Sequence, residues 1–427
     1  MNHNAVALAS PSPRQSELNA PLAPPSVPQS HSSANLFPDQ FGPYTAAVNT
    51  LCVAFEKDIV ERERNGGSAL EQRLQLRGSG LLKLAIPTRY GGLGERWPLI
   101  YRMIRRLSEA DSSLGHLFGF QHLQIASLLL FANADQQQHY LSRSAAQNWF
   151  WGNATNILGP QVSLTDAGDH YVLNGLKTFC SGSIDADALN VSAPDPRNPG
   201  VRLIIALPTH RTGITVLDDW DAFGQRQSDS GSVQFTHVRV NYDEVLGPPG
   251  ASGTPRATLR PCVSQLILTE IYLGNAQGAL RSAWHYTRTV ARAWVHSGVS
   301  QATDDPFIQQ RYGTLWLQFK AAVGLAEAAA QTLQKIWDLG DAVTAADRGE
   351  AALAIAEARV FAARTALNIT SQIFETMGAR AAASRYGFDR YWRNVRTHTL
   401  HDPLDYKLRD LGHWVLSGEP PVPSIYA

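Results

Sequence analysis

The hydrophobic period changes twice along this chain, and each change limits the folds that the sequence allows. From about residue 44 to 147 apolar residues recur at helical spacing, as in Trp97, Ile100, Ile104 and Leu107. Between residues 149 and 246 short apolar runs are separated by turn residues, which is typical of strands. From about residue 261 the helical period returns in long stretches. The order predicts a mainly α chain with a central β-domain.

This order divides the 427 residues into four parts. Residues 1–42 are rich in proline and serine and nearly lack large apolar side chains, so we expect a flexible tail. The remaining parts are a helical domain at 43–147, a β-domain at 148–254 and a helical bundle at 255–427.

The strands of the β-domain follow from turn chemistry. Val162–Thr165 and Tyr171–Leu173 flank a predicted turn at Asp166–Asp169. Asn174-Gly175 is a strong type I′ hairpin signal, because both central positions of that turn need positive φ. Further strands are predicted at 203–207, 214–217 and 232–240. About 100 residues of short antiparallel strands make a barrel or a sandwich.

Composition argues against several partners. Lysine plus arginine and aspartate plus glutamate both number 37, so neither nucleic acid nor a membrane surface is an expected partner. No apolar run approaches the roughly 18 residues of a membrane span, and the start lacks the pattern of a secretory signal. Three cysteines without a CxxC pair predict neither a disulfide framework nor a metal site. We therefore expect a cytoplasmic protein.

Nucleotide-binding, zinc-protease and serine-hydrolase motifs are missing from the sequence, and polar glycine-marked loops stand out instead. Trp149–Thr155 combines aromatic side chains with Asn153 and Thr155, which suits either a planar heterocycle or an ordinary junction with buried tryptophans. Lys177–Gly182 offers the Ser181 hydroxyl, while Cys180 fits a buried structural thiol better than a nucleophile. Gly224–Gly231 fits a ligand loop or a polar turn equally well.

The densest polar segment is Tyr391–Pro403. His398 and His401, three residues apart, are expected on one helical face, with Asp402 at its end. A metal site is disfavoured, because no second carboxylate–histidine cluster supports it. A general acid or hydrogen-bond donor fits better, and a satisfied histidine pair at a helix end is the alternative. Arg292 and Arg380, beside apolar helices, suit either a phosphate clamp or surface salt bridges.

Several runs together resemble one family. They are Asp111–Gly119, Gly152–Ala154, Phe179–Gly182, Gln227–Ser232, Tyr386–Arg390 and Trp392–Pro403. In these runs the chain resembles the acyl-CoA dehydrogenase superfamily, and within it the flavin-dependent monooxygenase branch typified by dibenzothiophene monooxygenase and the sulfur-acquisition oxidoreductases. The resemblance covers about residues 53–421.

The resemblance implies an N-terminal helical domain, a middle β-barrel and a C-terminal four-helix bundle, in a homo-oligomer that is usually tetrameric. It implies FMN rather than FAD, delivered in its reduced form by a separate NADH-dependent flavin reductase. Reduced FMN would react with O₂ to give a C4a-hydroperoxyflavin, which would oxygenate a small organosulfur compound, a sulfide or thiophene, to a sulfoxide or sulfone.

Motif matches assign roles in this chemistry to particular residues. The resemblance implies that Asn153 and Ser181 contact the flavin or the peroxide, and that His398 and His401 face the isoalloxazine, with His401 as donor or acid. It implies Arg292 and Arg380 as partners of the phosphate, across a subunit boundary. Three further residues complete the implied cofactor site, Thr155, Phe179 and Arg396, and three form the implied substrate pocket, His116, Phe120 and Phe179.

Two departures bear on the substrate. Phe120 stands where dibenzothiophene monooxygenase has a tyrosine, and the loop Ala154–Gln161 is shorter than in that enzyme. Three alternatives to the monooxygenase remain open. They are an FAD-dependent acyl-CoA dehydrogenase with Asp402 as base, a flavin-dependent N-hydroxylase, and a non-enzymatic protein that kept the fold.

Overall fold

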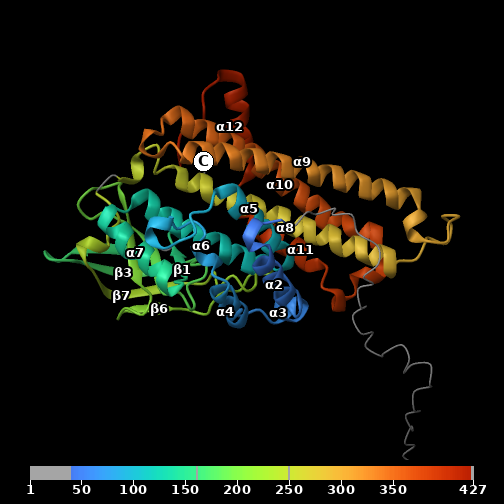
Figure 1. Ribbon diagram of the computed structural model, residues 1–427, viewed down its shortest axis with the longest axis horizontal. Helices are drawn as coiled ribbons and strands as arrows, with labels where there is room; N and C mark the ends of the chain where they lie inside the picture. Colours follow the sequence, from blue (N-terminus) through green and yellow to red (C-terminus); the bar gives the residue numbers. More distant parts are fainter. Residues whose placement is uncertain (1–39, 160–161, 249–250, 425–427) are drawn as a thin grey trace, which may run out of the picture. The chain divides into compact units, whose positions relative to one another are not determined.

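The computed structural model describes residues 40–159, 162–248 and 251–424. Of the tail predicted at 1–42, residues 1–39 lie outside this part, as do residues 160–161 of the loop after Asn153. The first helices are α2 (Thr45–Glu56), α3 (Ile59–Asn65), α4 (Leu70–Gly78), α5 (Trp97–Ala110), α6 (Ser112–Phe131) and α7 (Ala134–Gln147). Figure 1 shows them from blue to blue-green.

Helix α5 buries the stripe that the sequence predicts. Trp97 is 3% exposed, and Ile100, Ile104 and Leu107 are fully buried. The next helix, α6, is capped at its N-terminus by Asp111, whose side chain accepts a hydrogen bond from the Leu114 N–H at 3.1 Å. By length and hydropathy α6 could cross a membrane, but 89% of its most apolar window is buried inside the protein. It is therefore a core helix.

The β region forms two sheets. The strands are β1 (Trp151–Ala154), β2 (Val162–Asp166), β3 (Tyr171–Lys177), β4 (Ala188–Pro194), β5 (Arg202–Pro208), β6 (Ile214–Val216) and β7 (Val233–Val240). Their orders are β1-β4-β5 and β2-β3-β7-β6. Strands β5, β6 and β7 confirm three predicted segments to within one or two residues. Strands β1 and β4 were not predicted.

Of the two predicted alternatives, the sandwich is confirmed and the barrel is not: two separate sheets share one apolar core, with Leu189 and Ile205 from one sheet and Leu173 and Phe235 from the other. The strands are also not all antiparallel, because β1 pairs with β4 in parallel. A parallel pair needs a long connection, and residues 155–187 supply it with the hairpin of the other sheet.

Asn174-Gly175 is a bulge inside β3 and not a hairpin turn. The register of β3 against β7 shifts between Leu173 and Gly175, and Gly175 has φ 122°. The Asn174 side chain accepts a hydrogen bond from the His237 N–H at 2.8 Å across the bulge. The dipeptide supplies the unusual backbone conformation that its composition indicates, but in an irregular ladder. The tight turn lies at Asp166–Asp169, as predicted.

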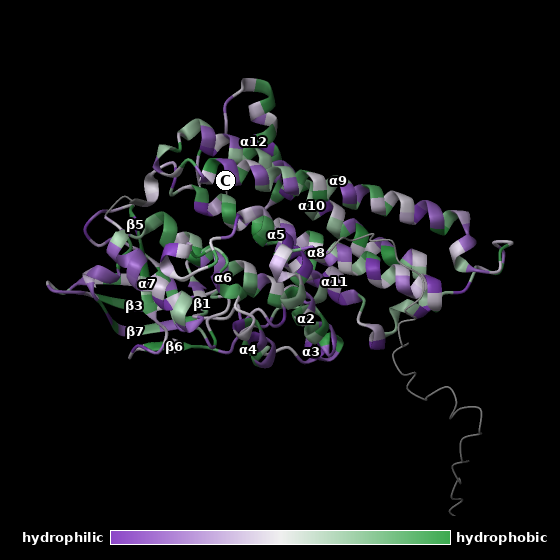
Figure 2. Ribbon diagram, in the orientation of Figure 1, coloured by the Kyte–Doolittle hydropathy of each residue, from purple (hydrophilic) through white to green (hydrophobic). Residues whose placement is uncertain are grey.

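The C-terminal part is helical. Its helices are α8 (Leu259–Thr289), α9 (Pro306–Trp337), α10 (Ala345–Met377), α11 (Asp389–Thr399) and α12 (Leu404–Ser417). Helices α8, α9 and α10 pack on one another, α5 packs on α8, and α11 contacts α8 and α10 (Figure 1). Hydrophobic and hydrophilic stretches alternate along α9 and α10, as expected for helices with one buried face (Figure 2).

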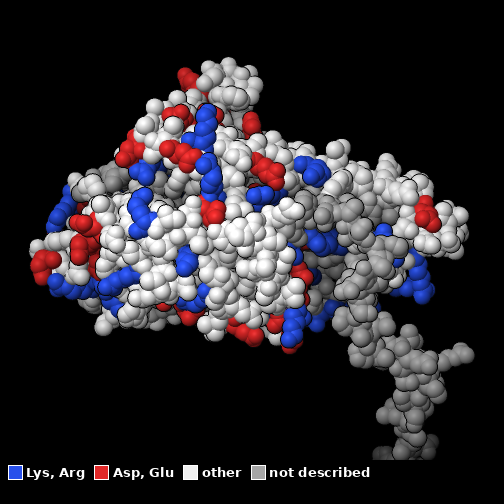
Figure 3. Space-filling model, in the orientation of Figure 1, with Lys and Arg blue, Asp and Glu red and all other residues white. Residues whose placement is uncertain are grey.

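Surface charge is mixed. On the face drawn in Figure 3, basic and acidic side chains are interspersed and neither sign forms a continuous field. This matches the equal numbers of basic and acidic residues in the sequence.

Candidate active site

One face of α6 carries polar side chains into the centre of the molecule. His116, Phe120, Gln124 and Ser127 follow one another at spacings of four, four and three residues, so they line one side of the helix. All four are buried. At 1.5 Å per residue the row is about 16 Å long. Each polar member of this row meets a different element of the fold.

The end of β1 lies against the middle of this row. Asn153 Oδ1 accepts hydrogen bonds from Gln124 Nε2 at 3.2 Å and from Thr155 Oγ1 at 2.7 Å. The Asn153 N–H donates to the Ser181 carbonyl at 3.0 Å, and the Ser181 hydroxyl lies 2.8 Å from the hydroxyl of Ser230. Three predicted site residues, Asn153, Thr155 and Ser181, are therefore brought together.

Two buried imidazoles meet at one end of the row. The rings of His116 and His398 lie with centroids 4.8 Å apart, and Phe120 stacks on His116 at 4.0 Å. Burial lowers the pKa of His116 to about 3, and burial together with the nearby His116 and His401 holds the pKa of His398 well below its usual value. Both rings are therefore neutral at pH 7.

These imidazoles have unused hydrogen-bonding capacity. Neither ring nitrogen of His116, nor Nδ1 of His398, has a hydrogen-bond partner among the described residues. A neutral imidazole carries one N–H and one lone pair, and a buried polar atom without a partner costs free energy. The pair is thus suited to bind a polar group of a ligand.

His401 lies beyond the end of α11 and not on one helical face with His398, because the helix ends at Thr399. Its Nδ1 is 2.9 Å from Asp402 Oδ1. The buried Arg359 also donates to Asp402 Oδ1, and Lys407 Nζ lies 3.6 Å from Oδ2. These partners outweigh burial and hold the pKa of Asp402 at about 2. Asp402 therefore fixes the orientation of His401 and is a very weak base.

The aromatic residues beside β1 are structural. Phe150 and Trp151 are each 1% exposed, and the Trp151 indole donates to Ser144 Oγ at 2.9 Å. The Arg73 guanidinium lies 4.6 Å from the centre of the Phe150 ring. Phe150 and Trp151 therefore fit the alternative expectation of a junction with buried aromatic side chains. Cys180 is also structural, since burial raises its pKa to about 12.

The loop Gly224–Gly231 is a buried junction. Asp229 forms an ion pair with the fully buried Arg73, and the Gln225 N–H donates to Asn394 Oδ1 at 2.6 Å. Its link to the site is Ser230, through the hydroxyl of Ser181. Phe179, just before Cys180, has 59% of its surface exposed. The centroid of its ring lies 6.0 Å from that of Trp220.

The predicted phosphate-binding residues, Arg292 and Arg380, lie far from the α6 row within the same chain. Arg292 follows the C-terminal end of α8, and Arg380 follows α10 at the same end of the bundle, where Thr287 of α8 donates to the Thr376 carbonyl of α10. Both arginines are exposed. Helix α8 has 31 residues and is about 45 Å long, and its other end lies at the site. Arg292 cannot reach the site of its own chain. Arg396 is partly buried on α11.

Sequence reasoning missed Arg260 in the first turn of α8. Its Nε donates to Ser127 Oγ at 2.7 Å and its Nη2 to Thr155 Oγ1 at 3.2 Å. It also missed Gln124, which joins Asn153 to Asn190 of β4 through a hydrogen bond of 3.0 Å. The spacing of His116, Gln124 and Ser127 is the only sequence signal that could have found this group.

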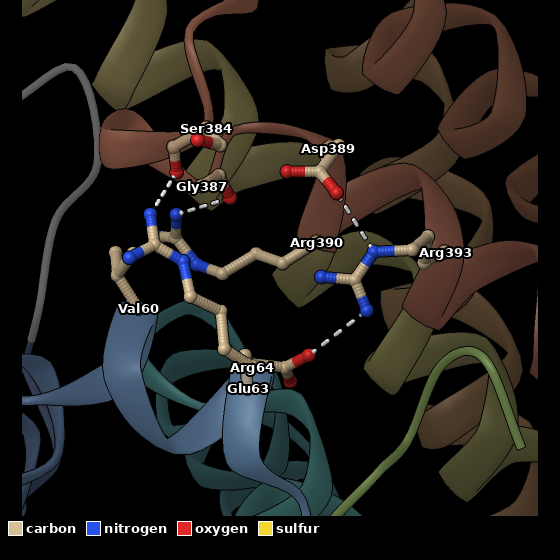
Figure 4. Close-up of a pocket in the computed structure, with 8 residues that line it drawn as sticks. All are labelled: Val60, Glu63, Arg64, Ser384, Gly387, Asp389, Arg390 and Arg393. Atoms are coloured by element: carbon tan, nitrogen blue, oxygen red, sulfur yellow. Dashed lines mark hydrogen bonds and ion pairs between the residues drawn. The ribbon is translucent and has the colours of Figure 1, made fainter.

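A separate cavity of about 120 Å³ lies between α3 and the start of α11 (Figure 4). Arg393 pairs there with Asp389 at 2.9 Å and Glu63 at 3.4 Å, and Arg390 donates to the Gly387 carbonyl at 2.9 Å. Arg64 donates to the carbonyl of Ser384. Protein partners already engage all three guanidinium groups, so the cavity joins two parts of the chain and is not the candidate site.

The fold and this arrangement of residues define a protein of acyl-CoA dehydrogenase type. Residues 52–148 match the acyl-CoA dehydrogenase N-terminal domain, and residues 266–406 match the C-terminal domain. A probable FMNH2-dependent monooxygenase, SfnC of Pseudomonas putida, is 42% identical over 385 residues, which cover 90% of this chain and 98% of that protein. Dibenzothiophene monooxygenase of Rhodococcus qingshengii is 44% identical over 88% of this chain and 94% of its own length.

Two solved structures of monooxygenases have folds similar to that of this chain. Methanesulfinate monooxygenase MsuC from Pseudomonas fluorescens has a TM-score of 0.88 at 44% identity, covering 90% of this chain and all of that one. FMN-bound TdsC from Paenibacillus sp. A11-2 has a TM-score of 0.86 at 42% identity, covering 90% and 99%. The chain belongs to the FMN-dependent monooxygenase branch of the acyl-CoA dehydrogenase superfamily.

Proposed function

We propose that this protein is a two-component monooxygenase that uses reduced FMN and O₂ to oxygenate a small organosulfur compound, a sulfide or thiophene, to a sulfoxide or sulfone. The similarity to dibenzothiophene and methanesulfinate monooxygenases over nearly the whole described chain carries the proposal. A separate NADH-dependent flavin reductase would supply the reduced FMN. All three cysteines are buried thiols, which suits a protein of the reducing cytoplasm.

The residues present fit a flavin. Both ring nitrogens of His116 and Nδ1 of His398 are buried hydrogen-bonding atoms without a partner among the described residues. Asn153, Thr155 and Ser181 offer further polar groups where Asn153 contacts Gln124 on the same helix, α6. Bound FMN, once reduced, would supply the electrons that activate O₂. A planar ring system about 10 Å long is shorter than the 16 Å row on α6, so it could contact several members of the row.

The proposed roles follow from the protonation states. His116 and His398, held neutral by burial, would donate hydrogen bonds without adding charge. His401 would act as the hydrogen-bond donor or acid, with its ring fixed by Asp402. Phe120 and Phe179 would exclude water, which protects a reactive oxygenated flavin.

The phosphate site is proposed to be completed by a second subunit. Arg292 and Arg380 lie at the far end of the bundle from Asn153, about the length of α8 away. They would bind the FMN phosphate of a neighbouring chain in a homotetramer, and Arg396 would add a contact from α11.

The geometry disfavours an acyl-CoA dehydrogenase. Its base would have to accept a proton at neutral pH, whereas Asp402 has a pKa of about 2 and is held by Arg359 and Lys407. A flavin-dependent N-hydroxylase is the second candidate, since a nucleophilic amine nitrogen could accept the oxygen atom in place of sulfur.

Rapid mixing tests the proposal. The protein with photoreduced FMN is mixed with oxygenated buffer, and the flavin spectrum is followed. A species distinct from both oxidised and reduced FMN, which persists and decays faster with a sulfide or thiophene than with an amine, is the expected result. Immediate return to oxidised FMN, together with reduction of bound FAD by an acyl-CoA, would refute it.

A further inference from the structure

Arg260 is a partly buried arginine that has no counter-charge among the described residues. Its guanidinium donates to two neutral hydroxyls, Ser127 Oγ at 2.7 Å and Thr155 Oγ1 at 3.2 Å. In residues 40–159, 162–248 and 251–424 it forms no ion pair with a carboxylate, unlike Arg73 and Arg359, which pair with Asp229 and Asp402. Burial alone, with no neighbouring charge to oppose it, lowers the pKa of Arg260 to about 10.

Such an arrangement is costly unless a ligand completes it. Removing a charge from water costs several kcal/mol, and buried arginines are ordinarily paired for that reason. At this pKa the guanidinium is still charged at pH 7. Two hydroxyls satisfy some of its donors but bring no negative charge. The missing charge is therefore expected from whatever binds beside Thr155.

Hydrogen bonds join Arg260 to the candidate flavin contacts. The Thr155 hydroxyl that accepts from Arg260 donates to Asn153 Oδ1, and Asn153 also accepts from Gln124. Along α6, Ser127 lies 11 residues from His116, about 16 Å away. The site thus has a cation at one end of the row and two neutral imidazoles at the other.

We propose that Arg260 is the counter-charge for the N1-deprotonated, anionic form of reduced FMN, and that it makes this site prefer reduced over oxidised flavin. This inference rests on the proposed function. The oxidised isoalloxazine is neutral, whereas the reduced ring becomes an anion when N1 loses its proton. A cation near one edge of the ring therefore stabilises one redox state more than the other.

The preference has a purpose in a two-component enzyme. The protein must take up reduced flavin released by its reductase in a solution that also contains oxidised flavin. The phosphate is the same in both forms, so Arg292 and Arg380 cannot distinguish them. A charge beside the isoalloxazine ring can distinguish the reduced form from the oxidised form.

The test compares affinities for the two redox states. Dissociation constants for oxidised FMN and for photoreduced FMN without oxygen are measured by flavin fluorescence and absorbance. Wild-type protein is expected to prefer reduced FMN, and Arg260→Met is expected to lower this preference at least 10-fold. A 10-fold change corresponds to a shift of about 30 mV in the potential of the bound flavin. Arg260→Lys, which keeps the charge, is expected to restore most of it.

Controls separate the possible sources of the effect. Arg256→Met removes an arginine that pairs with Asp341 at 2.5 Å and should leave the preference unchanged. Riboflavin, which lacks the phosphate, should show the same dependence on Arg260. If Arg260→Met weakens both redox states equally, or if its effect disappears with riboflavin, the inference is overturned.

A measurement on the wild-type protein keeps the inference testable if the variants do not fold. The absorbance spectrum of bound reduced FMN should remain that of the anion at pH values where free reduced FMN is neutral. A bound flavin that titrates like free flavin would contradict the inference. Failure of the wild-type protein to bind FMN in either state would instead count against the proposed function.

Discussion

Burial of neutral histidines should make this protein sensitive to mild acid, and His122 isolates the effect. His122 lies on α6, is fully buried, and packs edge-on against Phe118 with ring centroids 4.6 Å apart. Neither of its ring nitrogens has a hydrogen-bond partner among the described residues. Burial lowers its pKa to about 3.

Proton linkage gives the direction and size of the change in stability with pH. In the unfolded chain the imidazole has a pKa of about 6.5. Between this pH and the much lower pKa of the folded state, the unfolded chain binds a proton and the folded protein does not. Stability is therefore fully present above pH 6.5 and is lost as the pH falls from 6.5 towards 3. At pH 5, 1.5 units below the unfolded value, this one histidine costs about 2 kcal/mol.

The assay is urea unfolding at pH 7.5 and pH 5.0, at one protein concentration so that subunit association contributes equally. The loss of unfolding free energy between these pH values should be about 2 kcal/mol smaller for His122→Phe than for wild type. His210→Gln, which changes an exposed histidine in the turn after β5, is the matched control and should behave as wild type. An equal loss in His122→Phe and wild type would show that His122 is not held neutral.

Three further changes test the hydrogen-bonded site. Asp402→Asn should lower kcat by about 10²- to 10⁴-fold with FMN affinity retained, because the amide no longer fixes the orientation and tautomer of His401; steady-state kinetics with an unchanged kcat would contradict this. Arg359→Met leaves the buried Asp402 with Lys407 at 3.6 Å and should cost about 3–5 kcal/mol in urea unfolding, whereas a cost under 1 kcal/mol would mean that the pair is not buried as described. Asn153→Ala leaves Gln124 and Thr155 without their acceptor and should cost about 1–3 kcal/mol for each unpaired group, while Asn153→Asp, which keeps the acceptor, should cost less on the same assay.

The sequence predicts the helical and strand regions because most of their elements are amphipathic. The stripe of α5 and the alternation in β7 follow directly from one buried face. Strand β4 was missed because six of its seven residues are buried, so it shows no alternation. Strand β1, Trp151-Gly152-Asn153-Ala154, was missed because glycine and asparagine are rare in strands.

The site was only partly predictable for a related reason. Asn153, Ser181, His116 and His398 stand out by residue type and motif, and the structure brings Asn153 to Ser181 and His116 to His398. The row on α6 is harder to find, since a helix buried on nearly every side has no contrasting face to mark it. Arg260 meets Ser127 and Thr155 across more than 100 residues of chain, a contact that no local pattern encodes.

The position of α6 has a consequence for how the chain acquires its fold during synthesis. Helix α6 packs on α5 and α8, and α5 also packs on α8. Yet α8 begins at Leu259, long after α6 ends at Phe131. At 5–20 residues per second the ribosome needs roughly 6–25 s to make the intervening segment. During that time the apolar helix α6 lacks one of its two main packing partners, since only α5 has been made. The nascent chain is therefore expected to depend on chaperones until α8 emerges, and truncation before α8 should yield aggregates and not a stable N-terminal fragment.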